Sequence, residues 1–150
     1  MKVRNAVGAI IVWKEHPGSV LLVKKVKTED TLRADIDPEW DIPKGGLNDG
    51  EKADQGIWRE LAEEVGSTEF ALIRKLPFRI SFNFPPGSRW DSQETDLFYL
   101  EYSGPSRTFK PMTDEIAEAR WFPLKEAKRI ARYDTTVKAI EDAEGLGLLK

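Results

Sequence analysis

The sequence predicts an α/β fold in which a mixed β-sheet packs between helices. Most apolar segments are short and rich in β-branched or aliphatic residues, as is typical of strands. One helical segment follows the third of these strands, and two more lie near the end of the chain. At 150 residues, 40% of them hydrophobic, the chain has the length of one domain with one core. We therefore expect residues 1–150 to form a single domain.

The first half of the chain contains the expected hairpin and the first helix. Aliphatic runs at 3–13 and 20–23 flank a turn sequence, which predicts two paired strands, and the polar stretch from Lys24 to Glu39 predicts a long loop. A short strand at 40–42 then precedes the break at 43–46. Helical spacing of apolar residues runs from Lys52 to Val65, and Gly66 is expected to end that helix as its C′ residue.

The second half predicts a β-meander followed by two helices. The expected strands and helices occupy these segments: Phe70–Leu76, Arg79–Phe84, Asp96–Tyr102, Arg120–Phe122, Leu124–Ala131 and Thr135–Ala143. The sequence Pro85-Pro86-Gly87-Ser88 predicts a loop between the second and third of these strands. Asp134 is expected to be the N-cap of the last helix.

Composition limits the chemistry that the chain can perform. It has no cysteine and one histidine, His16, so a thiolate or histidine-rich metal site is excluded and any metal must be bound by oxygen ligands. The net charge of -3 argues weakly against a general polyanion-binding protein. The apolar run 6–13 is too short to span a membrane and no signal-peptide cleavage pattern follows it, so we expect a cytoplasmic protein without membrane contact.

Three carboxylates share one flank of the helix expected at 52–65. Glu60, Glu63 and Glu64 stand at positions i, i+3 and i+4, beside an apolar face formed by Ile57 and Leu61. Like charges at this spacing repel one another. The helix alone fits either a solvated acidic face, with Arg59 reaching Glu63, or a site for a hard cation such as Mg²⁺ or Mn²⁺.

The residues around this helix match a known motif. The chain resembles the Nudix family, whose signature is G-x5-E-x7-R-E-U-x-E-E-x-G-U with U a bulky aliphatic residue. The fixed positions are filled by Gly45, Glu51, Arg59, Glu60, Leu61, Glu63, Glu64 and Gly66. The last position is Ser67, which departs from the pattern at a packing residue. The approach Trp40-Asp41-Ile42-Pro43-Lys44-Gly45-Gly46 and the stretch around Trp121-Phe122-Pro123 also resemble the family, so the likeness covers roughly residues 6–143.

The resemblance implies the Nudix α/β/α sandwich and assigns roles to individual residues. Glu60, Glu63 and Glu64 would bind Mg²⁺ or Mn²⁺, with the Gly45 carbonyl as a further ligand. Arg59 and Glu51 would pair and hold the geometry of the loop and helix, a supporting role in catalysis. Hard cations favour hydrolysis of a phosphoanhydride, because they neutralise its oxygens and activate a bound water.

Outside the helix the candidates rest on weaker signals. Glu115, six residues before Trp121, resembles a later metal-binding glutamate of the RNA 5′-pyrophosphohydrolase branch and is our candidate base and metal ligand, although it could equally be an exposed loop acid. Lys44 is placed to meet a phosphate. Trp90 and Phe84 are candidates for stacking on a base, Trp90 being the better one because alternate strand residues point inward. Lys24, Lys25 and Lys27 fit a solvated strand end better than phosphate contacts.

The expected function is metal-dependent hydrolysis of a diphosphate linkage in a nucleoside diphosphate joined to another group, by attack of water on phosphorus. Dinucleoside polyphosphates are the first candidate substrates. The alternatives are the RNA 5′ end and diphosphoinositol polyphosphates. A non-catalytic module that binds a nucleotide or RNA is a further alternative, but such modules are expected to lose signature carboxylates, which are all present here. The sequence leaves the oligomeric state open.

Overall fold

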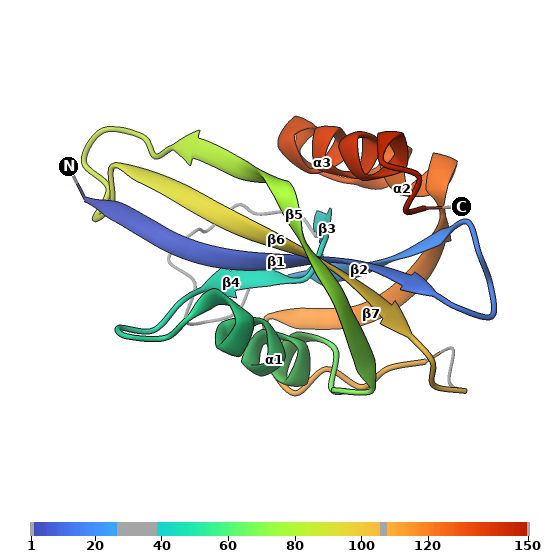
Figure 1. Cartoon of the computed structure of the whole chain (residues 1–150). Coiled ribbons are helices and arrows are strands. Elements are labelled where there is room, and N and C mark those ends of the chain that lie inside the picture. Colours follow the sequence, from blue (N-terminus) through green and yellow to red (C-terminus); the bar gives the residue numbers. More distant parts are fainter. Residues whose placement is uncertain (1, 27–38, 106–107, 150) are drawn as a thin grey trace.

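The protein folds as one mixed β-sheet with helices on both faces (Figure 1). The structure, a computed structural model, describes residues 2–26, 39–105 and 108–149. Its elements are β1 (Val3–Trp13), β2 (Ser19–Lys25), β3 (Glu39–Asp41), β4 (Lys44–Gly46), α1 (Ala53–Glu64), β5 (Phe70–Asn83), β6 (Ser92–Tyr102), β7 (Ile116–Pro123), α2 (Leu124–Ile130) and α3 (Asp134–Gly145). The strands run in the order β3-β2-β1-β6-β5, while β4 pairs with β1 and β7 pairs with β2.

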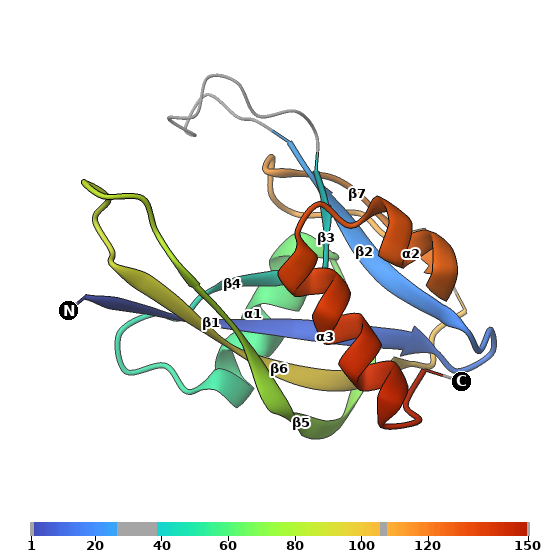
Figure 2. The ribbon, with the colours of Figure 1, turned by 90° about the horizontal axis from the view of Figure 1, so that it is seen from above.

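Strand β1 lies at the centre of the sheet and is buried on both faces. Val7, Ala9 and Ile11 pack into the core beneath α1, whereas Ile10 and Val12 pack into the core beneath α2 and α3. A strand covered on both faces must be apolar at every position, which is why the run lacks alternation. Figure 2 shows α3 crossing one face of the sheet with α1 on the other. The predicted α/β/α sandwich with a mixed sheet is therefore confirmed.

Helix α1 forms where the sequence predicts it. Its first turn is closed by Gln55, whose side-chain oxygen accepts a hydrogen bond of 3.1 Å from the Lys52 amide. Ile57, Leu61 and Val65 are fully buried against the sheet. The helix ends at Gly66, whose φ of 76° suits glycine, and a Cβ atom there would overlap the carbonyl of Lys110.

Several expected boundaries were wrong. The break at 43–46 contains β4, which pairs antiparallel with β1. The two strands expected at 70–76 and 79–84 form one strand, β5, whose register against β6 shifts between Lys75 and Arg79. A bulge there accommodates Pro77, which cannot donate to the ladder. The meander is consequently the single hairpin β5–β6, because β6 continues parallel to β1 and β7 pairs with β2.

Smaller corrections concern the ends of elements. Tyr133, not Asp134, is the N-cap of α3, and Asp134 is the first helical residue. Strand β7 is longer than expected and includes Glu118. Most of the loop expected from Lys24 to Glu39 lies outside the described residues, and its ends belong to β2 and β3. Among the described helices none is long and apolar enough to cross a membrane.

Candidate active site

Strand β4 and helix α1 bring the predicted metal ligands together. β4 pairs with β1 through Gly45 opposite Val7 and Lys44 opposite Gly8, which fixes it against the centre of the sheet. The last turns of α1 pack against this strand. The Lys44 amide donates a hydrogen bond of 3.0 Å to Glu64 Oε1, and a Cβ atom at Gly45 would overlap the Glu60 carboxylate. Only glycine leaves room for Glu60 at this position.

Two of the three helix carboxylates are buried. Glu60 and Glu64 are almost inaccessible to solvent, whereas the Glu63 side chain is 52% exposed. Burial raises the pKa of Glu64 to about 8, and it also raises the pKa of Glu60. The solvated acidic face is therefore the wrong interpretation for Glu60 and Glu64, since a fully solvated carboxylate would keep its ordinary pKa.

Arg59 connects the loop before α1 to the carboxylates. Its Nε and Nη2 donate to the two oxygens of Glu51 at 3.0 and 2.7 Å, and Nη2 also donates to the Gly46 carbonyl at 2.9 Å. Nη1 donates to Glu60 Oε1 at 2.8 Å and lies 3.7 Å from Glu63 Oε2. This two-pronged contact lowers the pKa of Glu51 to about 2. The arrangement fits the supporting role expected for Arg59 and Glu51.

The three carboxylates are not gathered into a ready-made cage. Within the ranges that the structure describes, no set of three or more Asp, Glu, His or Cys side chains converges on one point as cation ligands do. Arg59 lies between Glu60 and Glu63 and supplies positive charge to both. The ligand roles of Glu60, Glu63, Glu64 and Gly45 therefore remain predictions.

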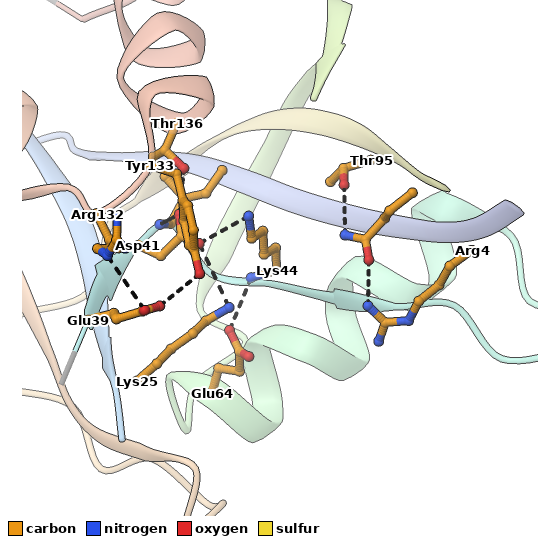
Figure 3. A network of polar contacts seen from close by, with 12 residues as sticks. Arg4, Lys25, Glu39, Asp41, Lys44, Glu64, Thr95, Arg132, Tyr133 and Thr136 are labelled. Atoms are coloured by element: carbon orange, nitrogen blue, oxygen red, sulfur yellow. Dashed lines mark hydrogen bonds and ion pairs between the residues drawn. The ribbon is translucent and has the colours of Figure 1, made fainter. Parts of the chain in front are cut away.

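A second network, on the α3 side of β4, was not anticipated (Figure 3). Asp41, at the end of β3, is completely buried, and its Oδ2 lies 3.0 Å from Lys44 Nζ and 3.9 Å from Lys25 Nζ. Lys25 thus turns into the site, so the solvated strand end is wrong for this residue. Lys24 lies over the Trp40 ring at 6.0 Å, and Lys27 falls outside the described residues.

Comparison with known proteins identifies the family. The family model described as NUDIX domain matches residues 2–142, which is nearly the whole chain. The chain belongs to the Nudix family.

Relatives and solved structures support this assignment. An RNA pyrophosphohydrolase of Helicobacter pylori is 31% identical over 145 residues, which cover 91% of this chain and 88% of that protein. An RNA pyrophosphohydrolase of Acidiphilium cryptum is 29% identical over 79% of this chain and 80% of the relative. Nudix hydrolase 26 of Arabidopsis thaliana is 27% identical over 73% of this chain, which spans only 57% of that protein. The predicted Nudix pyrophosphohydrolase is thereby confirmed at the level of the family.

Structural similarity extends to proteins of low sequence identity. An Ap4A hydrolase of C. elegans superposes with a TM-score of 0.73 at 18% identity, covering 95% of this chain and 96% of that chain. A dihydroneopterin triphosphate pyrophosphohydrolase of E. coli gives a TM-score of 0.72 at 18% identity, covering 95% and 97%. At this level of identity the likeness establishes the shared fold.

A cleft of about 750 Å³ opens beside the Nudix loop. It lies between the segment Gly46–Glu51, the first residues of β1 and the hairpin β5–β6, and Trp90 lines it. Arg4, Arg79 and Arg89 also line it, and no sequence pattern marked these arginines as site residues. Glu94 and Asp96 contribute acidic groups, and Asp96 Oδ1 accepts a 2.6 Å bond from Arg79. The helix carboxylates do not line this cleft.

The remaining candidates lie at different distances from the helix. Phe84 packs edge-on against Phe82, with ring centroids 5.1 Å apart, and does not line the cleft. Lys44 is only 11% exposed, and its ammonium is engaged by Asp41 and lies over the Tyr133 ring at 5.4 Å. Glu115 is exposed immediately before β7, in a segment tied to α1 by a 2.8 Å hydrogen bond from the Met112 amide to the Glu63 carbonyl. Glu115, Lys44, Trp90 and Phe84 thus keep their roles as predictions.

Proposed function

We propose that this chain is a metal-dependent Nudix pyrophosphohydrolase that cleaves a phosphoanhydride bond at the 5′ end of RNA. The observation that carries the proposal is the pair of buried carboxylates, Glu60 and Glu64, held against Gly45 at the edge of β4. Buried carboxylates without a matching positive charge are costly. Here Arg59 contacts Glu60 but makes no hydrogen bond or ion pair with Glu64.

The donor set suits a hard cation. Carboxylate and carbonyl oxygens are the ligands that Mg²⁺ and Mn²⁺ prefer. Glu60, Glu63, Glu64 and the Gly45 carbonyl would hold the ion, and the absence of a Cβ at Gly45 keeps the strand close to Glu60. When bound, such an ion neutralises phosphate oxygens and lowers the pKa of a coordinated water.

The chain's own residues supply orientation and proton transfer. Arg59 and Glu51 fix the loop that carries Gly45 and Gly46, since the arginine bonds both the Glu51 carboxylate and the Gly46 carbonyl. Glu115 is the proposed base that takes a proton from the attacking water. Trp90, at the wall of the cleft, is the proposed stacking partner of a nucleoside. Phe84 is a weaker candidate because it faces Phe82.

The relatives favour RNA over the dinucleoside polyphosphates that the sequence suggested first. The RNA pyrophosphohydrolases of Helicobacter pylori and Acidiphilium cryptum align over most of their own lengths. The Ap4A hydrolase, by contrast, is similar in fold at 18% identity, which carries no argument about substrate. Diphosphoinositol polyphosphates would favour a strongly basic pocket, whereas the cleft combines arginines with acidic residues. A binding-only module is disfavoured because every signature carboxylate is present. The cytoplasmic location stays a prediction.

A substrate panel tests this proposal. A 5′-triphosphorylated RNA oligonucleotide, a dinucleoside tetraphosphate and a diphosphoinositol polyphosphate would each be incubated with Mg²⁺, and the released products identified. We expect the RNA to be the best substrate by kcat/KM, with phosphate or pyrophosphate released. Preference for the dinucleoside tetraphosphate would return the assignment to the first alternative. Tight binding of RNA without any product would favour the binding module.

A further inference from the structure

The carboxylate of Asp41 lies at the centre of a buried network on the α3 side of β4. Its Oδ1 accepts hydrogen bonds from the Ile42 amide at 2.8 Å and from the Thr136 hydroxyl of α3 at 2.7 Å. Its Oδ2 accepts no hydrogen bond but forms ion pairs with Lys44 and, more distantly, with Lys25. A carboxylate that is completely buried persists only when such partners compensate for its lost hydration.

This network is joined to the helix carboxylates through Lys44. The side chain of Lys44 reaches Asp41, 3.0 Å away, while its backbone amide donates to Glu64 Oε1 on the other side of the strand (Figure 3). The next residue is Gly45, against which Glu60 packs. Lys44 is therefore anchored at both ends, and its side-chain anchor determines how β4 faces α1.

Lys25 extends the same network from β2. Burial raises the pKa of Glu64, and the Lys25 ammonium opposes that rise. Asp41 lies opposite this ammonium, 3.9 Å from it, so it helps to hold Lys25 between the two groups of carboxylates. Removing the Asp41 charge would leave two neighbouring ammonium groups without their shared partner.

We propose that Asp41 is a positioning residue of the active site. Its ion pair with Lys44 holds β4 so that the Lys44 amide and Gly45 meet Glu64 and Glu60, and its bond to Thr136 couples the C-terminal helix to this arrangement. The inference rests on the proposed function, because it treats Glu60 and Glu64 as the groups whose placement matters. Asp41 acts through Lys44 and β4, and does not itself touch the substrate.

The test compares Asp41→Asn with a control of similar burial, Tyr99→Phe. Tyr99 donates a 2.8 Å hydrogen bond to the Leu148 carbonyl on the same face of the sheet and is remote from β4. Both variants should unfold at lower temperature. Only Asp41→Asn should weaken Mn²⁺ binding, measured by calorimetry, and lower kcat, each by roughly tenfold or more with KM changed less. Equal Mn²⁺ affinity in wild type and Asp41→Asn would reduce Asp41 to a purely structural residue.

Variants of Thr136 test the same link if Asp41→Asn fails to fold. Thr136→Val removes the hydroxyl that bonds Asp41 and should weaken Mn²⁺ binding severalfold, whereas Thr136→Ser keeps the hydroxyl and should restore wild-type binding. Equal binding by the two variants would overturn the coupling to α3. If the wild-type protein binds Mn²⁺ but hydrolyses none of the substrates, the proposed function fails. Weaker Mn²⁺ binding by Asp41→Asn would then still support the positioning role.

Discussion

The Glu60 carboxylate lies directly against Gly45, in the space that a Cβ atom would occupy. Gly45→Ala should therefore displace Glu60 or push β4 away from α1, while leaving the cores on both faces of the sheet unchanged. We expect Mn²⁺ affinity and kcat to fall by about tenfold to a hundredfold. Gly145→Ala is the matched control, because nothing lies within 4 Å of a Cβ at that helix end. Wild-type activity in Gly45→Ala would argue against Glu60 as a ligand.

Arg59 makes contacts that a lysine cannot reproduce. A lysine keeps the charge but loses the planar fork that bonds both oxygens of Glu51 and the Gly46 carbonyl. Arg59→Lys should lower the free energy of unfolding by about 1–3 kcal/mol, the range for hydrogen bonds to charged groups. Chemical denaturation measures this change.

The control for Arg59 is Arg129, whose pair with Glu126 lies on the exposed surface of α2. Arg129→Lys should change stability by less than about 1 kcal/mol, as is usual for exposed ion pairs. Should both substitutions have the same small effect, Arg59 would not be the structural link between the loop and α1.

Glu115 and Glu118 differ in surroundings although they are close in sequence. Glu118 Oε1 accepts a 2.7 Å bond from Arg120 within β7, whereas the Glu115 side chain is exposed just before that strand. We expect Glu115→Gln to lower kcat by about a hundredfold with a much smaller change in KM, as for loss of a general base. Glu118→Gln should have little effect. The reverse pattern would place the base in β7, and no effect in either variant would assign proton removal to α1.

The stability of the metal-free protein should depend on pH through Glu64. Because burial raises its pKa from 4.5 to about 8, folded Glu64 keeps a proton that the unfolded chain releases. This contribution is fully present below pH 4.5 and is lost as the pH rises toward 8. With chelator present, the unfolding temperature should fall by several degrees across this window.

Glu64→Gln cannot titrate and supplies the comparison for this pH dependence. Its unfolding temperature should vary less between pH 5 and pH 8 than that of the wild type. Glu51 does not interfere, since its pKa is lowered to about 2 and its effect falls below this window. Identical pH dependence in the two proteins would show that Glu64 is not the group responsible.

The sequence predicted those elements whose pattern is local. Helix α1 was recognisable because Ile57, Leu61 and Val65 repeat at helical spacing, and the carboxylates follow from the signature on the same helix. Strand β4 was missed because a three-residue strand with two glycines has no apolar pattern, and only its pairing with β1 defines it. Pro77 suggested two strands where a bulge maintains one.

Asp41 was missed for a related reason. In the sequence it is a polar residue at the end of a short strand. Its burial depends on Thr136, which lies 95 residues away on α3, and on the side chains of Lys25 and Lys44. Such an environment is created by tertiary packing, and no periodicity in the sequence reveals it.

The central claim is that carboxylates of α1 hold the cation on which hydrolysis depends, and Glu63→Gln tests it most directly. Glu63 is half exposed, so the substitution should leave the fold intact while removing a charged ligand. With a 5′-triphosphorylated RNA oligonucleotide and Mg²⁺, wild-type protein should release phosphate or pyrophosphate, lose this activity on chelation and regain it when Mg²⁺ is restored. Glu63→Gln should be about a hundredfold slower. Chelator-resistant hydrolysis, or wild-type turnover by Glu63→Gln, would contradict the account.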